Sequence, residues 1–450
     1  MFLRTSLLGI PHRAGQRERL RLALGGSFRR LPLQPALGPS LLAGASVAIA
    51  AIALVPSPLR AADDFSVVDN PETPANGVER LQLEELWRVS GEDEDVLLGV
   101  TQRIEEAPDG TFYFLDMQLT EIQVFSPSGE YLRSIGHEGE GPGEFQRPNG
   151  VFMLPDAVIG VIQGRPGKVV LLQQDGTPAG NLPVPGTETG SVFLGTGRAV
   201  GDRIYLQVNQ GERTDTGFKS HNRTLAMDRK GEVLATFDET DIERNFTNPS
   251  FDEKEGFGGR RWDVGANGEF YKVATFDDYR IEVQSPDGTP LHAIQRTYPP
   301  RKRSDEEKAW VQGQMVFRGP RRMQIDMKVS PTDPAIVNLF PRPDGSLWVL
   351  SSRGAYDRDN GVIATFDEFS PQGVFVRQVE LLGEGNARDD GLFFTGKDHL
   401  IVIRELSDAR RAMQGSSGDD ESTKEDVLSD PLSVICYRIP SLRSGGTAGN

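Results

Sequence analysis

Residues 103–135, RIEEAPDGTFYFLDMQLTEIQVFSPSGEYLRSI, decide the fold of this chain. They contain short runs in which apolar and polar residues alternate, which is the pattern of a strand with one buried face. Tight turns at Gly110 and Gly129 divide these runs into pairs, and glycine adopts the positive φ that such hairpin turns require. The stretch therefore predicts two successive hairpins, which together make four antiparallel strands.

The same pair of hairpins recurs along the chain. The second hairpin aligns in five copies on the turn glycines Gly129, Gly176, Gly231, Gly288 and Gly373. Hairpins of the first kind begin at six places, namely Arg103, Gly150, Phe193, Trp262, Val337 and Leu392. Four strands in a unit that repeats about every 40–60 residues are typical of a propeller blade. The sequence predicts an all-β protein, a six-bladed β-propeller of four-stranded antiparallel blades.

The sixth unit is one strand short. Its third strand, 432–439, contains Cys436, the only cysteine, which we interpret as a small core residue; no fourth strand follows. An unassigned strand pattern lies upstream of the first unit, at 81–89 around Trp87. Because closing the ring removes two exposed sheet edges, we expect this N-terminal strand to pair with the strand that contains Cys436.

Other segments interrupt or flank the propeller, which we assign to 81–440. One short inserted helix is expected at 304–317, because Ser304 and Glu307 have the spacing of a capping box. The sequence also predicts a solvated acidic loop at 407–430, a linker at 63–80 and a disordered tail at 441–450.

The first 62 residues differ in composition from the rest. They carry eight arginines and one acidic residue, then an apolar run at 41–55 and a stretch of small residues, which is typical of a signal peptide. Arg29-Arg30 leaves twin-arginine export open beside general secretion, and an uncleaved inner-membrane anchor is the alternative to cleavage. We expect an extracytoplasmic protein, periplasmic or secreted.

The net charge restricts the partners. It is −16 for the whole chain and becomes −23 if residues 1–62 are removed. General nucleic-acid binders carry the opposite sign, so nucleic acid is not an expected partner. A protein partner or a polar small-molecule or glycan ligand fits an acidic exported protein.

Polar residues recur where each innermost strand is expected to begin. Counting back from the first turn of a unit gives the candidate ligand-binding residues of the channel mouth, which are Arg103, Asn149, Arg261, Asp263, Asn338 and Asp390. Convergent amide, carboxylate and guanidinium groups at one mouth can bind a polar ligand or an ion.

The segment 131–150, YLRSIGHEGEGPGEFQRPNG, resembles the linker of NHL repeats, in which a glycine-rich turn followed by Phe and Pro leads to the next inner strand. Over 81–440 the chain looks like the bacterial six-bladed propellers of the NHL or TolB-like type. The resemblance implies a ring around a channel and several activities, since the relatives include protein and glycan binders, calcium-dependent lactonases and lyases. Asn149, Asn338 and Asp390 resemble the Asn/Asp calcium ligands of the lactonases, but their Glu ligand has no match here.

No HExxH, CxxC or GxSxG motif occurs in the sequence. The sequence therefore favours an exported binding module without catalysis or cofactor of its own. Two alternatives stay open: a metal-dependent lactonase, hydrolase or lyase that uses calcium in the channel, and a scaffold within an envelope assembly.

Overall fold

The computed structural model describes residues 65–90, 96–187, 192–247, 250–255, 257, 261–314, 326–415 and 432–442. The expected signal peptide and nearly all of the tail lie outside these ranges. Among the helices of the described ranges, none has the length and apolar character needed to span a membrane.

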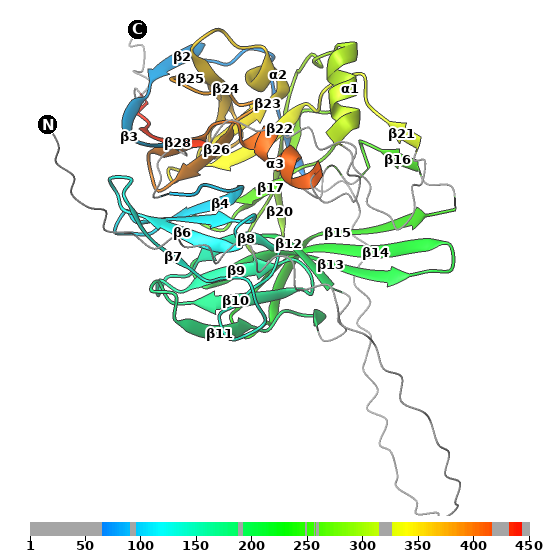
Figure 1. The fold of residues 1–450 in the computed structure, drawn as a ribbon. Coiled ribbons are helices and arrows are strands. Elements are labelled where there is room, and N and C mark those ends of the chain that lie inside the picture. The colour runs from blue at the N-terminus through cyan, green and yellow to red at the C-terminus, as the bar shows by residue number, and fades with distance from the viewer. Residues whose placement is uncertain are drawn as a thin grey trace, which may run out of the picture. The chain divides into compact units, whose positions relative to one another are not determined.

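The described chain is an all-β, six-bladed propeller, as the repeat predicts (Figure 1). Each blade is a four-stranded antiparallel sheet whose first strand is innermost. Blade 1 consists of β4 (Thr101–Glu106), β5 (Phe112–Asp116), β6 (Glu121–Phe125) and β7 (Tyr131–Ile135). Blade 2 consists of β8 (Pro148–Met153), β9 (Ile159–Gln163), β10 (Lys168–Leu172) and β11 (Pro178–Leu182). Blade 3 consists of β12 (Val192–Val200), β13 (Arg203–Arg213), β14 (Gly217–Met227) and β15 (Val233–Asn245). Blade 4 consists of β17 (Trp262–Val264), β18 (Phe270–Val273), β19 (Arg280–Gln284) and β20 (Pro290–Arg296). Blade 5 consists of β22 (Ile336–Pro341), β23 (Leu347–Ser351), β24 (Val362–Phe369) and β25 (Phe375–Leu382). Blade 6 consists of β26 (Gly391–Thr395), β27 (His399–Ile403), β28 (Ser433–Arg438) and β3 (Glu84–Ser90).

The ring closes through the N-terminal strand. β3 pairs antiparallel with β28, and Trp87 lies opposite Cys436 in the register. Both side chains are buried in the core cluster between blades 6 and 1. The expected closure is confirmed, and it places the first and last strands of the propeller in one blade.

The range 63–80 is not the linker that its polar sequence predicts. It contains β1 (Ser66–Asn70), which pairs in parallel with β20, and β2 (Val78–Gln82), which pairs in parallel with β25. Both strands are added to the outer edges of blades 4 and 5. An outer edge strand keeps most side chains in solvent, so it has little of the alternation that marks a strand in sequence.

The described ranges contain three helices where one was expected. α1 (Asp305–Gln314) begins with the predicted capping box, since Ser304 N donates to Glu307 Oε2 at 2.8 Å and Glu307 N donates to Ser304 Oγ at 3.1 Å. α2 (Ser352–Tyr356) is capped by Ser351, whose Oγ accepts from Gly354 N. α3 (Leu406–Gly415) occupies part of the expected acidic loop. The loop assignment was wrong there because Leu406, Ala409 and Met413 pack against the blade 6–1 core; residues 416–430 lie outside the described ranges.

All insertions emerge on one face of the ring. In an antiparallel blade, the beginning of the innermost strand, the connection between the second and third strands and the connection to the next blade lie at the same end. These are the positions of α1, α2 and α3, of the long β13–β14 hairpin, and of the small parallel sheet of β16 (Ser250–Asp252) and β21 (Asp326–Lys328). We call this end the insertion face. The opposite face has tight turns, many with a glycine at φ of 80–90°, such as Gly110 (84°) and Gly129 (84°).

A histidine joins blade 6 to blade 1 and gives the fold a testable pH dependence. His399 Nδ1 lies 2.9 Å from Glu106 Oε2, and this hydrogen bond raises the pKa of His399. A raised folded pKa means that the stabilisation is fully present below the unfolded value of about 6.5 and is lost as the pH rises through the folded value. In urea unfolding, we expect the difference in free energy of unfolding between wild type and Glu106→Gln to decrease as the pH rises through that window. The same difference at low and high pH would contradict this role of the pair.

Candidate functional site

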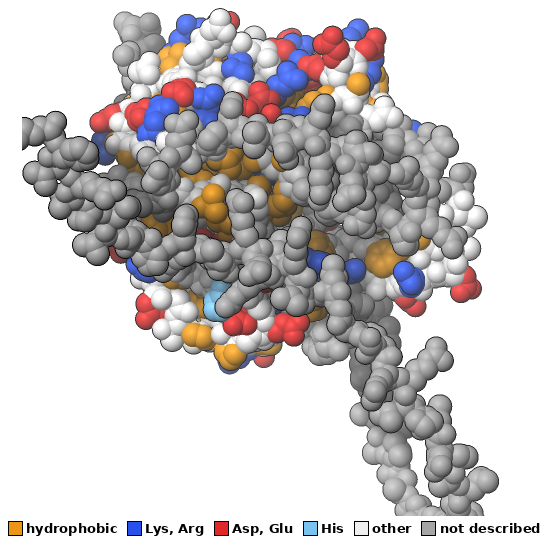
Figure 2. Space-filling model, in the orientation of Figure 1, with side chains coloured by type: hydrophobic (Ala, Val, Ile, Leu, Met, Phe, Trp, Pro, Cys, Tyr) orange, Lys and Arg blue, Asp and Glu red, His pale blue; other side chains and the backbone are white. Residues whose placement is uncertain are grey.

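All six innermost strands surround a central cavity of about 650 Å³. Five of the six candidate residues line it, namely Arg103, Asn149, Asp263, Asn338 and Asp390. Figure 2 shows apolar side chains gathered near the middle of the molecule, over β4 in Figure 1, with charged side chains toward the top and the bottom of the view. The apolar lining includes Phe340, Phe393 and Phe394. The cavity, which we call the channel, thus combines apolar walls with a few charged and amide groups, as ligand sites do.

Irregular strand starts direct side chains into the channel. The pairing register shifts within β4, β8, β12 and β22, near the beginning of each strand. The residues skipped by these shifts include Gln102, Asn149, Thr196 and Val337, and all four line the channel. A β-bulge turns a side chain away from the regular alternation, and bulges are common beside binding sites.

Two arginines with carboxylate partners lie in the channel. Arg103 Nε is 3.0 Å from Glu105 Oε1, and Arg198 Nε is 2.8 Å from Asp263 Oδ1. Burial lowers the pKa of Arg198, and the positive charge of Arg103 lowers it further. The positive charge of Arg103 therefore acts on Arg198, and the carboxylates of Asp263 and Glu105 oppose this effect.

A third arginine reaches the channel from α3. Arg410 lines the cavity and is partly buried. Its Nη2 donates to the carbonyl of Thr101 at 3.1 Å, whereas its buried Nε has no hydrogen-bond partner. No carboxylate of the described ranges forms an ion pair with Arg410, and burial lowers its pKa. The guanidinium of Arg410 therefore has a buried N–H donor that no protein group in the described ranges accepts from.

Asp390 has a structural role. Its side chain is fully buried, 2.9 Å from Arg404 Nε, and it accepts hydrogen bonds from the backbone N–H groups of Asn386 and Glu405. Burial raises its pKa despite these partners. These contacts order the loop before β26 and occupy both carboxylate oxygens.

The two amide candidates are placed differently. Asn149 Nδ2 donates to the carbonyl of Leu194 at 2.8 Å, which fixes the amide between blades 2 and 3. Asn338 is exposed, and its Oδ1 accepts from Leu339 N at 3.0 Å. Nowhere in the described ranges do three or more His, Cys, Asp or Glu side chains gather in a way that could hold a metal ion.

Arg261 does not line the channel, contrary to the sequence prediction. It lies one residue before β17, its guanidinium is 3.8 Å from the centre of the Phe257 ring, and its Nε donates to the carbonyl of Val337. The side chain lines a separate cavity of about 310 Å³ beside α1. The strand begins at Trp262, so the count from the turn placed Arg261 one position too far into the blade.

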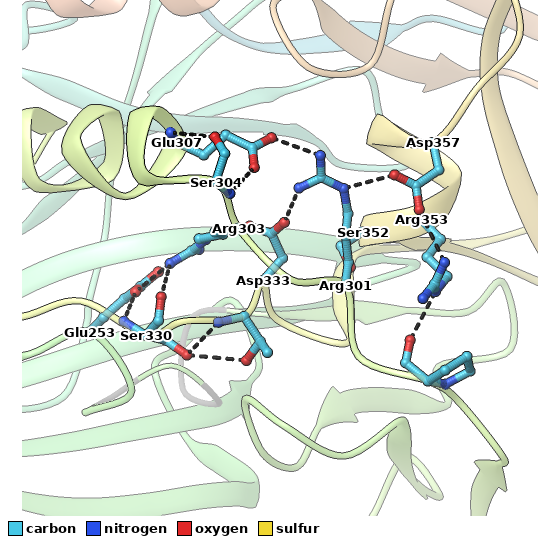
Figure 3. Close-up of polar contacts among 12 residues, drawn as sticks. Glu253, Arg301, Arg303, Ser304, Glu307, Ser330, Asp333, Ser352, Arg353 and Asp357 are labelled. Carbon is cyan, nitrogen blue, oxygen red and sulfur yellow. Dashed lines mark hydrogen bonds and ion pairs between the residues drawn. The ribbon is translucent and has the colours of Figure 1, made fainter.

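An ion-pair network holds α1 on the insertion face (Figure 3). Arg301 pairs with Glu307 of α1, with Asp333 and with Asp357, at 2.6–2.9 Å. Arg303 pairs with Asp333 and Glu253 at 2.6 and 2.7 Å. The network ties α1 to the segments before β22 and after β23, and the guanidinium of Arg411 over the Trp310 ring connects α3 to α1.

The sequence prediction missed Arg198 and Arg410. No candidate came from blade 3, because the register of β12 shifts between Leu194 and Gly197 and a fixed count from the turn fails there. Arg410 was missed together with α3. The signal for that helix was present in the spacing of Leu406, Ala409 and Met413, which fall on one helical face.

The comparisons with known proteins agree with the fold. A family model described as "6-bladed beta-propeller" matches residues 92–170, which span blade 1, the first two strands of blade 2 and part of the third. A search of the curated proteins finds no match.

Several solved structures resemble the chain at low identity. A putative exported protein from Bacteroides fragilis is 15% identical with a TM-score of 0.45, over 84% of this chain and 100% of that one. A DUF4221 family member from Bacteroides vulgatus is 12% identical with a TM-score of 0.46, over 80% and 98%. A calcium-binding regucalcin from Agrobacterium tumefaciens is 11% identical with a TM-score of 0.39, over 81% and 97%. The strand order and the family model together identify the chain as a six-bladed β-propeller.

Proposed function

We propose that this propeller binds a ligand outside the cytoplasm and takes an anionic group of that ligand into the channel. The observation that carries the proposal is Arg410, a partly buried guanidinium with no carboxylate partner among the described residues, which lines the same channel as Arg103 and Arg198. Three guanidinium groups face two carboxylate partners, Glu105 and Asp263. Arginine is the side chain best suited to carboxylate and phosphate groups, so an anion fits this channel better than a cation.

Other observations support parts of this proposal. The insertions α1, α2 and α3 all lie on the insertion face, where loops can form a specific surface over a rigid scaffold. The basic and then apolar leader supports export. We also propose the NHL-like type, because buried Phe145 and Pro148 lead from β7 into β8 in the manner of that linker.

The alternative proposal is a metal-dependent lactonase, hydrolase or lyase with Asn149, Asn338 and Asp390 as ligands. It requires Asp390 to be available, whereas both oxygens of this carboxylate already accept hydrogen bonds and one lies against Arg404. The scaffold hypothesis involves a protein partner instead, and it predicts capture of envelope proteins independently of Arg410.

Calorimetric titration of the purified protein with galacturonate, citrate and inorganic phosphate tests the proposal. We expect at least one of these anions to bind, and Arg410→Gln to weaken that binding about tenfold, since a charge-assisted hydrogen bond contributes about 1.5–3 kcal/mol. Arg388→Gln is the matched control, because Arg388 is exposed on the same face outside the channel lining. Equal binding by wild type and Arg410→Gln would contradict the proposal. So would metal-dependent lactone turnover that is lost in Asn149→Ala.

A further inference from the structure

A second cavity adjoins the channel on the insertion face. It has a volume of about 500 Å³ and lies between blades 2 and 3, and Asn149 lines both cavities. We call it the blade 2–3 groove. It is formed by the beginnings of β8, β12 and β14, the end of β13 and the turn between β9 and β10. A ligand that enters the channel at Asn149 can therefore continue into this groove.

The groove contains a row of polar and aromatic side chains set by the strand register. Phe193 lies opposite Asn209, and Asn209 lies opposite Asn222, so the three occupy neighbouring strands on one side of the blade. Ser220 Oγ donates to Asn222 Oδ1 at 2.8 Å and continues this polar surface. Amides offer both donors and acceptors, which suits a ligand with many hydroxyl groups.

Asn209 has an unmet hydrogen-bonding requirement. Its Oδ1 is buried and accepts no hydrogen bond. A buried acceptor without a donor is costly, and such atoms are usually satisfied by water or a ligand. In this groove the missing donor can be a hydroxyl group of a ligand.

Two glycines allow aromatic rings to lie against the backbone of the groove. A Cβ atom on Gly211 would overlap the Phe218 ring, so that ring occupies the space beside the strand. A Cβ atom on Gly164 would lie 3.1 Å from Cε2 of Phe193, whose side chain is 38% exposed. Phe218 is partly buried and Phe193 is exposed, and flat rings with open faces beside amides suit a ligand with both an apolar face and polar edges.

The charge of the groove differs from that of the chain. None of the described residues that line it is acidic, although the whole chain has a net charge of −16. Arg147 and Arg165 line it from blade 2, both are exposed, and neither has an ion-pair partner in the described ranges. Guanidinium groups of this kind favour carboxylate or sulfate groups on the ligand.

We propose that the blade 2–3 groove binds an acidic oligosaccharide whose chain continues from the channel. The sugar faces stack on Phe193 and Phe218, the hydroxyl groups bond to Asn209 and Asn222, and the acidic groups pair with Arg147 and Arg165. This inference rests on the proposed function, because it takes the anion in the channel to be one unit of the same chain.

The test compares galacturonate, a short oligogalacturonide and a neutral gluco-oligosaccharide of the same length by calorimetry. We expect the oligogalacturonide to bind more tightly than the monomer and the neutral chain. Arg165→Gln and Phe218→Ala should each weaken the oligogalacturonide about tenfold and leave the monomer unchanged. Asn209→Asp, which keeps the shape and adds a negative charge, should also weaken only the oligogalacturonide. The matched control is Lys219→Gln, an exposed charge on β14 that pairs with Asp241 and lies outside the groove lining.

The outcomes separate the two proposals. If Arg410→Gln weakens the monomer but the oligogalacturonide binds no better than the monomer or the neutral chain, the groove inference is wrong and the channel proposal stands. The groove inference is also wrong if Arg165→Gln and Phe218→Ala bind the oligogalacturonide like wild type. If Arg410→Gln changes neither ligand while the groove variants weaken the oligogalacturonide, the groove binds it and the channel proposal fails.

Discussion

Replacing Trp87 with alanine is expected to lower the free energy of unfolding by about 3–5 kcal/mol, the usual cost of removing a large buried aromatic side chain. Trp87 packs edge-on against Phe112 of blade 1 at 5.5 Å between ring centres. Its ring also fills the space beside Gly129, where a Cβ atom would lie 2.5 Å away. The side chain thus connects the closing strand to the next blade, and its loss weakens the closure itself.

Labelling of the Cys436 thiol measures locally how often the ring closure at Trp87 opens. It lies opposite Trp87, is fully buried, and burial raises the pKa of its thiol to about 12. Since the thiolate is the reactive form, labelling requires that blade 6 opens. We expect Trp87→Ala to accelerate labelling in native buffer strongly. The control Trp310→Ala, at a residue 36% exposed on α1, should change neither labelling nor stability much. Equal labelling of wild type and Trp87→Ala would contradict closure at this position.

The second large effect is expected at a buried ion pair between blades 4 and 5. Arg296 Nη2 lies 2.9 Å from Asp367 Oδ2, and both side chains are almost completely buried. Tyr279 and Gln378 donate to the carboxylate at 2.8 and 2.9 Å, and the guanidinium lies over the rings of Tyr279 and Phe375. Asp367→Ala is expected to cost about 3–5 kcal/mol, because it leaves a buried charge without its partner.

A double variant distinguishes an unpaired charge from lost packing. Burial raises the pKa of Asp367 even though Arg296 opposes the shift, so the carboxylate is strongly desolvated in this pair. The combination Arg296→Met and Asp367→Leu should therefore regain most of the stability lost in Asp367→Ala. The measurement is chemical unfolding of both single variants and the double variant. If the double variant loses as much free energy of unfolding as the two single variants together, the loss comes from packing and not from an unpaired charge.

The strand alternation and the turn glycines were sufficient to predict the blades. Each predicted hairpin pair became part of a blade, and the missing fourth strand of blade 6 led to the pairing of Trp87 with Cys436. β1 and β2 were not predictable in this way, because they add to outer edges and keep mostly exposed side chains. Their position depends on hydrogen bonds to strands more than 200 residues away, which no local pattern records.

The candidate site was predictable only where the innermost strand is regular or has a one-residue bulge near its beginning. Arg103, Asn149, Asp263 and Asn338 reach the channel as expected. Arg198 follows a longer register shift, and Arg410 comes from a helix outside the repeat. The charge balance of the channel depends on these two arginines. The residue types at the strand starts therefore did not by themselves lead to the proposal of an anionic ligand.

The most direct test of the central claim, that the channel binds the anionic group, is a crystal structure of the protein with galacturonate. We expect the sugar carboxylate in the channel, within hydrogen-bonding distance of Arg410 and of Arg103 or Arg198. The result that would contradict the account is a channel that holds only solvent while the sugar binds at the opposite face or at the outer edges of the blades.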